Sequence, residues 1–237
     1  MMEELTPFWI TILILGLCIF AYLLGSIPSA YLVGRWVKGI DLREYGSGTV
    51  SGSMVWEHVA KWAVFPVGIF DILKGAFPTW LSLKLGMGEV AAMIVGFCAV
   101  IGHNWPVYLN FHGGRGLSPF LGELLVLFPA GMFFLLIGLA IGWLLHSATV
   151  PLFTIIFMPI FSRVISGPQI VLWMALIMTL ITITKRIQAN QRPLPEAADE
   201  RRKVLLRRIF LDRDIDSQQD WIHRGPDSQG LSGSKPG

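Results

Sequence analysis

Residues 8–33 read FWITILILGLCIFAYLLGSIPSAYLV, an apolar run without a charged side chain. A helix needs about 20 apolar residues to cross the hydrocarbon core of a bilayer, so this run is long enough to span it. The acidic start MMEE at residues 1–4 and the length of the run argue against a cleaved signal peptide. We therefore predict a first membrane span here, with the N-terminus outside.

Composition extends this prediction to most of the chain. The 237 residues are 53% hydrophobic and 15% charged, whereas soluble domains contain roughly 25% charged residues. Of the 35 Lys, Arg, Asp and Glu residues, 19 fall in residues 185–237. This distribution predicts an all-α polytopic membrane domain over residues 1–192 and a polar, cytoplasmic, partly disordered tail over residues 193–237. The net charge of +3 belongs mostly to the tail. Basic residues next to a membrane more often face anionic lipid, so this charge does not indicate nucleic acid as a partner.

Further apolar segments follow the first span. Those at 55–85 and 90–109 are separate stretches, whereas 117–184 is apolar nearly throughout and is divided by helix-breaking residues. The breaks are Pro129, His146-Ser147 and Ser166-Gly167-Pro168, which give segments 117–128, 130–145, 149–165 and 169–184. Seven spans place the basic residues after 184 in the cytoplasm, as the positive-inside tendency favours, whereas six would place them outside.

The tail contains one segment with helical character, residues 199–211. Its apolar residues Val204, Leu205, Ile209 and Phe210 share one side of a helix, with basic residues beside them. This pattern predicts either an interfacial helix on the membrane or a solvated helix. From Asp212 onward, Ser, Gln, Gly and Pro accumulate, which is typical of disorder.

Three polar clusters interrupt the apolar pattern near the predicted cytoplasmic face. The first, residues 41–49, contains Gly46-Ser47-Gly48 with Arg43 close by. Glycines let a backbone turn and expose its N–H groups, so this loop can bind an oxyanion. A Gly-Ser-Gly sequence on its own is more often a flexible loop without a ligand.

The second cluster is Asp71-Ile72-Leu73-Lys74-Gly75. Asp71 and Lys74 are three residues apart, so they share one face of a helix and can neutralise each other. Alternatively, Lys74 faces a polar cavity and binds an anionic ligand while Asp71 orients it. Charged groups inside an apolar span are costly and mark either structural pairing or function.

The third cluster joins His103 to the loop Gly113-Gly114-Arg115-Gly116. A glycine-rich loop with a cation at the start of a helix offers backbone donors and a fixed positive charge, which suits phosphate. His103 alone is equally compatible with a buried structural hydrogen bond. No His, Cys, Asp or Glu residues show the spacing of metal ligands, so no metal site is expected.

Together, and in this order, the clusters resemble the motifs of the PlsY family, bacterial membrane acyltransferases that use acyl-phosphate to acylate glycerol 3-phosphate. The resemblance covers about residues 10–192. It is carried by Gly25–Ser29, Asp41–Thr49, Asp71–Gly75, Gly102–Val107 and Phe111–Gly116. It implies a seven-span enzyme of the bacterial cell membrane that makes lysophosphatidic acid at the cytoplasmic face. Its partners would be glycerol 3-phosphate, acyl-phosphate and membrane lipid, and the resemblance implies no metal, nucleotide or other cofactor.

The resemblance also implies roles for individual residues. The implied catalytic residues are Ser47, His103 and Arg115. The implied substrate-binding residues are Arg43, Gly46, Gly48, Lys74, Gly113, Gly114, Gly116, Ser147 and Arg192.

Several positions depart from the family's pattern. Thr49 and Ala189 stand where it has asparagine, Glu57 where it has arginine and Arg186 where it has histidine. Arg115 stands where it has lysine, which keeps the charge and changes the geometry. These departures keep two alternatives open: a non-catalytic or altered-specificity paralogue that binds lipid precursors, and, with less support, an anion transporter.

Overall fold

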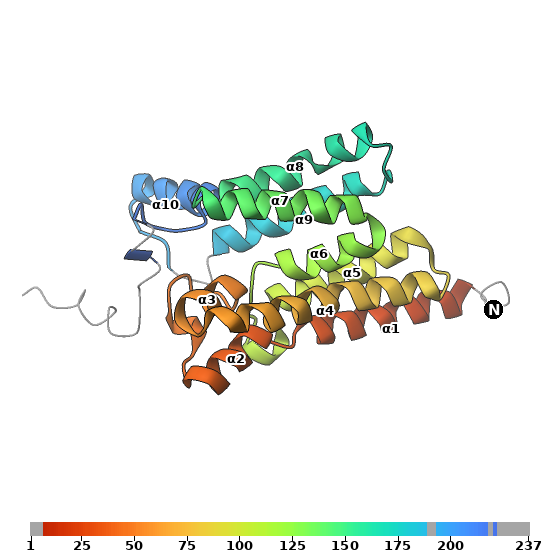
Figure 1. Cartoon of the computed structure of the whole chain (residues 1–237), viewed down its shortest axis with the longest axis horizontal. Helices are drawn as coiled ribbons and strands as arrows, with labels where there is room; N and C mark the ends of the chain where they lie inside the picture. The colour runs from red at the N-terminus through yellow and green to blue at the C-terminus, as the bar shows by residue number, and fades with distance from the viewer. Residues whose placement is uncertain (1–6, 189–192, 218–219, 222–237) are drawn as a thin grey trace, which may run out of the picture.

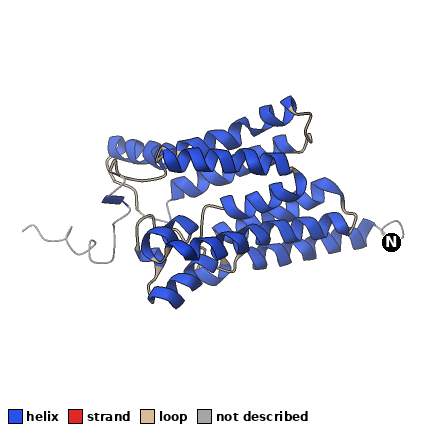
Figure 2. Ribbon diagram, viewed as in Figure 1, coloured by secondary structure: helices blue, strands red, loops and turns tan. Residues whose placement is uncertain are grey.

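The computed structural model describes residues 7–188, 193–217 and 220–221, and within them every regular element is a helix (Figure 2). The longer helices are α1 (Pro7–Gly25), α2 (Ser29–Lys38), α3 (Gly52–His58), α4 (Val64–Lys84), α5 (Gly88–Asn104), α6 (Leu117–Leu127), α7 (Pro129–Leu144), α8 (Thr149–Val164), α9 (Val171–Gln188) and α10 (Ala198–Leu211). Short 3-10 helices are η1 (Leu42–Glu44), η2 (Lys61–Ala63) and η3 (Val107–Leu109).

The predicted apolar segments are helical. Four helical stretches of the described chain are long and apolar enough to cross a membrane, and α6, α7 and α8 are shorter apolar helices. The four long stretches are Phe8–Lys38, Lys61–Lys84, Gly88–Leu109 and Val171–Gln188. The predicted breaks at Pro129, 146–147 and 166–168 fall at helix boundaries.

Two predicted segments are divided by turns that hydropathy did not reveal. The run 8–33 is interrupted between Gly25 and Ser29, because Pro28 has no N–H to continue the helix. The stretch 55–85 is likewise divided into the end of α3, η2 and α4. These turns place α2 and α3 at one end of the bundle (Figure 1). That end is where the polar clusters meet.

The helices form two packed groups. Helices α1, α4, α5 and α6 lie against one another, and α7, α8 and α9 form a second group beside them (Figure 1). A close approach of α1 and α5 depends on glycine: a Cβ on Gly102 would lie 2.1 Å from the carbonyl oxygen of Tyr22. The main core joins both groups through buried side chains such as Phe120, Leu135 and Met174.

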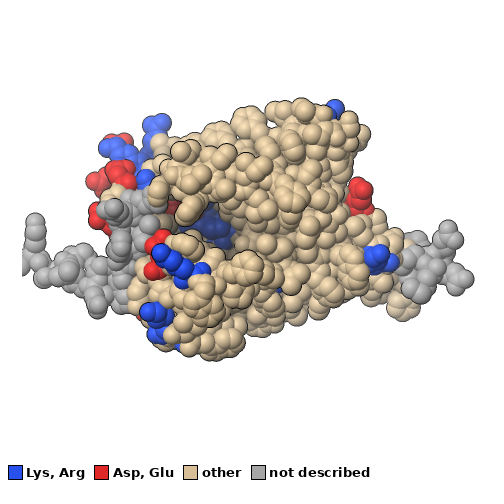
Figure 3. All heavy atoms as spheres, in the orientation of Figure 1, with Lys and Arg blue, Asp and Glu red and all other residues tan. Residues whose placement is uncertain are grey.

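The outer surface is apolar around the middle of the bundle and charged at one end. Large hydrophobic side chains such as Leu180, which is 66% exposed, cover the outside. An exposed apolar surface of this extent is typical of a protein surrounded by lipid. Charged atoms gather at the end that carries α2, α3 and α10, and Lys or Arg atoms lie at the floor of a hollow there (Figure 3).

The tail helix is present and packs against the membrane domain. The predicted segment 199–211 corresponds to α10, which contacts α9. Arg208 of α10 is 2% exposed, and its Nη1 donates to the carbonyl of Ile187 on α9 at 3.0 Å. Helix α10 is therefore held by protein contacts, which neither a purely solvated nor a purely interfacial helix would make.

Candidate active site

The centre of the polar end is a buried ion pair on α4. Lys74 Nζ lies 2.7 Å from Asp71 Oδ1 and also donates to the carbonyl of Ile27. The Ser29 hydroxyl donates to the same Asp71 oxygen at 2.6 Å. Both charged side chains are almost completely buried. Of the two alternatives that the sequence left open, the structure shows the pairing of Asp71 with Lys74, and residues 27–29 after α1 supply two of the groups around it.

His103, near the end of α5, joins this centre. Its Nδ1 lies 3.8 Å from Asp71 Oδ1, and the Gly114 N–H donates to the His103 carbonyl at 3.0 Å. A Cβ on Gly114 would lie 2.1 Å from His103 Nε2, so the loop can approach the ring this closely only with glycine. We call Ser29, Asp71, Lys74 and His103 the Lys74 centre.

The two predicted glycine loops meet beside this centre. The Val50 N–H donates to the carbonyl of Gly113 at 3.3 Å, which ties the end of the Gly46–Thr49 loop to the second loop. A small crevice of about 10 Å³ lies between the second loop, Val50 and the turn after α1. It is lined by residues 25–30, Val50, His103, Pro106, Gly113 and Gly114. The structure thus brings His103, Gly113 and Gly114 together as predicted.

Ser47 lies in a ladder of hydroxyl groups within the first loop. Its hydroxyl is hydrogen-bonded to the hydroxyl of Thr49 and accepts the Thr49 N–H at 3.1 Å. Gly46 and Gly48 have φ angles of +48° and +70°, a conformation that glycine adopts without strain. Thr49 therefore supplies a hydroxyl partner for Ser47 at a position where the family pattern has asparagine.

Arg43 forms a separate pair with Asp41. Its Nη2 lies 2.6 Å from Asp41 Oδ2, and its guanidinium lies 5.3 Å from the centre of the Tyr31 ring. The hydrogen bond from Arg43 holds the pKa of Asp41 below its usual range, against the opposing effect of burial. The contacts of the Arg43 guanidinium are thus with Asp41 and Tyr31, and none of them joins Arg43 to the Lys74 centre.

A second set of charges surrounds Arg115, in the loop before α6. Arg115 Nη2 lies 2.9 Å from Asp212 Oδ1, and Nη1 donates to the carbonyl of Lys185 at 3.3 Å. Arg186 Nε lies 3.9 Å from the same Asp212 oxygen. Lys185 Nζ donates at 2.6 Å to the carbonyl of Asn104, the residue that follows His103 in the chain. We call Arg115, Lys185, Arg186 and Asp212 the Arg115 cluster.

The remaining predicted residues lie at the edge of the site or outside the description. Ser147 lines a cavity of about 560 Å³ together with Glu57, Trp143 and Asp212. Gly116, with a φ of +79°, begins α6 beside the Asn104 side chain. Arg192 lies outside the described residues.

Sequence reasoning missed several residues of this region. Lys185 is interpreted in the sequence only as a topology signal, and Arg186 only as that and as a departure from the family's histidine. Their position directly after the last apolar segment could have indicated a site. The Asn104 side chain is buried without a hydrogen-bond partner among the residues that the structure describes, and it lies inside the motif Gly102–Val107. Asp212 carried no signal, since it lies in a tail expected to be disordered.

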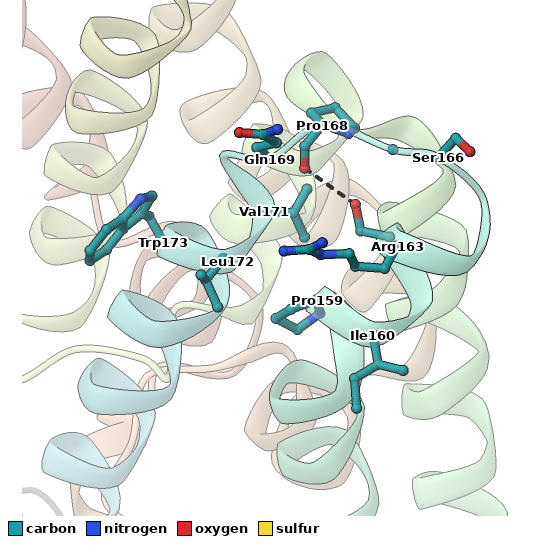
Figure 4. Close-up of a pocket in the computed structure, with 11 residues that line it drawn as sticks. Pro159, Ile160, Arg163, Ser166, Pro168, Gln169, Val171, Leu172 and Trp173 are labelled. Carbon is teal, nitrogen blue, oxygen red and sulfur yellow. Dashed lines mark hydrogen bonds between the residues drawn. The ribbon is translucent and has the colours of Figure 1, made fainter.

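A different cavity, of about 510 Å³, lies between the end of α8 and the start of α9 (Figure 4). It is lined by Arg163, Gln169 and Trp173, among others, and the Ser162 hydroxyl donates to the Pro168 carbonyl at its edge. None of the predicted site residues lines it. Its size therefore does not make it the candidate active site.

The fold and site define a polytopic helical membrane protein with cationic groups and glycine loops suited to phosphorylated ligands at one end. The family model for glycerol-3-phosphate acyltransferase matches residues 15–194. The chain belongs to this family, and the predicted resemblance and all-helical membrane fold are confirmed.

Individual relatives agree with this assignment. "Glycerol-3-phosphate acyltransferase 5" of Dehalococcoides mccartyi is 38% identical over 217 residues, which cover 88% of this chain and 92% of the relative. "Glycerol-3-phosphate acyltransferase 4" of another strain of that species is 36% identical, with coverages of 86% and 90%. The glycerol 3-phosphate form of PlsY, a crystal structure of an integral membrane glycerol 3-phosphate acyltransferase, matches with a TM-score of 0.65. It is 31% identical, and the match covers 76% of this chain and 90% of that one.

Proposed function

We propose that this protein transfers a fatty acyl group from acyl-phosphate to a hydroxyl of glycerol 3-phosphate, which yields lysophosphatidic acid and inorganic phosphate. The observation that carries this proposal is the convergence of the Lys74 centre and the glycine loops in a member of this family. The named relatives favour catalysis over the two alternatives, a non-catalytic paralogue and an anion transporter. The relatives solved with glycerol 3-phosphate and lysophosphatidic acid support the acceptor and the product.

Two phosphorylated substrates need two sets of positive charge. The Lys74 centre offers one ammonium, and the Arg115 cluster offers two guanidinium groups and a second ammonium. Lys74, Arg115 and the N–H groups of Gly113 and Gly116 hold the two phosphates in this mechanism, and Gly114 holds their loop against His103 through its bond to the His103 carbonyl. Gly46, Gly48, Arg43, Ser147 and Arg192 complete substrate binding. The small crevice is too tight for glycerol 3-phosphate, so the loops separate when substrate enters.

The chemistry requires little from the protein beyond positioning. The acceptor hydroxyl attacks the carbonyl carbon of acyl-phosphate, the acyl–oxygen bond to phosphate breaks, and the released phosphate can take the proton. Because acyl-phosphate is already activated, no covalent enzyme intermediate is needed. Ser47 and His103 orient the reacting groups, and Arg115 neutralises the charge that grows on the leaving phosphate.

The site faces the cytoplasm of a bacterial cell in this proposal. Seven spans with the N-terminus outside place α2, α3 and α10 on the inner side, where charged atoms gather (Figure 3). An acyl chain then extends from the site into lipid, while glycerol 3-phosphate arrives from the aqueous side.

The direct test uses detergent-purified protein with palmitoyl-phosphate and labelled glycerol 3-phosphate, followed by chromatography of the labelled lipid. We expect lysophosphatidic acid from palmitoyl-phosphate and none from palmitoyl-coenzyme A. Ser47→Ala should reduce the rate by about 10-fold to 100-fold, because a positioned polar group is lost. Ser53→Ala is the matched control, since the exposed Ser53 hydroxyl is hydrogen-bonded only to that of Ser51.

Other outcomes separate the alternatives. Folded protein that binds glycerol 3-phosphate but forms no product would support the non-catalytic paralogue. Flux of glycerol 3-phosphate into proteoliposomes without acylation would support a transporter. Equal rates with both acyl donors would refute the assignment of acyl-phosphate as the donor.

A further inference from the structure

Asp212 lies beyond the part of the chain that the family model matches, yet its carboxylate is in the site. The match ends at residue 194, and Asp212 immediately follows α10. Its Oδ1 lies 2.9 Å from Arg115 Nη2 and 3.9 Å from Arg186 Nε. We propose that Asp212 is a positioning residue that holds the Arg115 guanidinium in the orientation that binds substrate phosphate. This inference rests on the proposed function, which gives Arg115 that role.

Arg115 needs such a partner because its other surroundings are cationic. Lys185 and Arg186 both lie in the same cluster and repel a third positive charge. The guanidinium donates to the Lys185 carbonyl through a long hydrogen bond of 3.3 Å. An arginine side chain is flexible and loses conformational entropy when it is fixed. A carboxylate 2.9 Å from Nη2 offsets both the repulsion and this entropy by charge attraction.

The end of α10 is anchored, so Asp212 is presented by a fixed element. Arg186 Nη1 donates to the carbonyl of Ile209 at 2.6 Å, and the Thr149 hydroxyl donates to that of Phe210 at 2.7 Å. These are carbonyls of the last helical turn, which have no partner within the helix. Arg208 adds its bond to the Ile187 carbonyl. These bonds connect α10 to α8 and α9 immediately before Asp212.

This anchoring favours positioning over competition with substrate. A carboxylate on a loose loop could leave Arg115 when phosphate arrives, whereas Asp212 directly follows a helix end that three bonds hold in place. A guanidinium has five N–H donors, and Asp212 occupies one nitrogen, so donors remain for a phosphate. Asp212 also lines the cavity of about 560 Å³ that Ser147 lines, which places this carboxylate at the wall of a space of substrate size.

The test combines Asp212→Asn, which keeps the shape and removes the charge, with Asp212→Glu, which keeps the charge. Asp216→Asn is the matched control, since exposed Asp216 pairs with Arg207 in the same tail. We expect Asp212→Asn to raise the KM for one phosphorylated substrate about 10-fold, with a smaller change in kcat. Asp212→Glu should recover part of this loss, and Asp216→Asn should stay within about twofold of the parent.

A double-mutant cycle with Arg115→Gln separates positioning from a general structural role. If Asp212 acts through Arg115, Asp212→Asn has no further effect on KM in the Arg115→Gln background. An equal loss in both backgrounds would overturn the proposal. A lower KM for Asp212→Asn than for the parent would also overturn it, because it would show that the carboxylate competes with substrate.

Binding of inorganic phosphate, measured by calorimetry, tests Asp212 without turnover. Asp212→Asn should weaken phosphate binding about 10-fold, and unchanged binding would overturn the positioning role. If the parent protein binds phosphate but forms no lysophosphatidic acid, the proposed function fails while this titration still decides on Asp212. If the parent binds no phosphate, the positioning role of Asp212 is wrong, while formation of lysophosphatidic acid still decides on the proposed function.

Discussion

The Lys74 centre and the Arg115 cluster both place positive charge at the same end of the molecule, but they are built differently. The Lys74 centre comes from α2, α4 and α5, and its ion pair is almost completely buried. In the Arg115 cluster the Arg115 and Asp212 side chains are 14% and 20% exposed, and the carboxylate comes from the tail. The centre is therefore a rigid core feature, whereas the cluster depends on docking of a distant helix.

Among the substitutions that distinguish the two regions, Lys74→Met should cause the largest loss of acyl transfer and of stability. The substitution leaves the Asp71 carboxylate buried without its cation, and breaking a buried pair costs about 3–5 kcal/mol. We expect at least a 100-fold loss of acyl transfer and a lower melting temperature in detergent. Lys84→Met on the same helix is the control, because Lys84 lies over the Trp80 ring near the opposite end of α4.

Asp71→Asn combined with Lys74→Met sharpens this result. The double variant removes both charges, so it should regain much of the melting temperature while remaining inactive. An active double variant would show that Lys74 has only a structural role.

Gly114→Ala should cause the next largest loss of activity, because the added methyl group pushes the second loop away from His103. The new Cβ would lie 2.1 Å from His103 Nε2. We expect a loss of roughly 10-fold to 100-fold in kcat/KM, since small displacements of positioning groups are costly. Gly68→Ala on α4 is the control, because nothing lies within 4 Å of its Cβ position. Similar rates for both variants would contradict the tight packing of this loop.

Thr149→Val tests the anchoring of α10 and therefore the Arg115 cluster alone. It removes the hydroxyl that donates to the Phe210 carbonyl, a hydrogen bond worth about 1 kcal/mol. We expect a small drop in melting temperature and a two- to fivefold rise in the KM that Asp212→Asn also raises. Thr184→Val on α9 is a control for a change of the same size at an exposed position. A KM equal to that of the parent would show that this anchor does not control Asp212.

The smallest effect should come from Asp41→Asn, which lies outside both regions. The pKa of Asp41 is lowered by its hydrogen bond to Arg43. The pair therefore stabilises the fold fully at any pH above the ordinary pKa of an Asp side chain, and this contribution is lost as the pH falls through the lowered pKa. We expect a cost of about 0.5 kcal/mol near pH 7, because partly exposed pairs contribute little. Thermal melts at decreasing pH check the sign: the difference from the parent should persist at about pH 5 and shrink below pH 3.8.

The sequence by itself determined the helical membrane class, the helix boundaries within residues 117–184 and most of the Lys74 centre. Hydropathy and helix breakers act locally, and Asp71, Lys74, His103 and the glycines lie in short segments whose chemistry is visible along the chain. The turn at Pro28 was also present in the sequence. It was passed over because an average of hydropathy does not register a missing N–H.

Only the tertiary structure decided the composition of the Arg115 cluster. Asp212, Lys185 and Arg115 come from the tail, from α9 and from the loop before α6, and no local pattern relates them. Their meeting depends on α10 packing against α8 and α9 through bonds to the carbonyls of its last turn. Such bonds join side chains to backbone groups far away in sequence, and backbone carbonyls are the same at every residue. The sequence alone therefore does not predict which carbonyl accepts each of these hydrogen bonds.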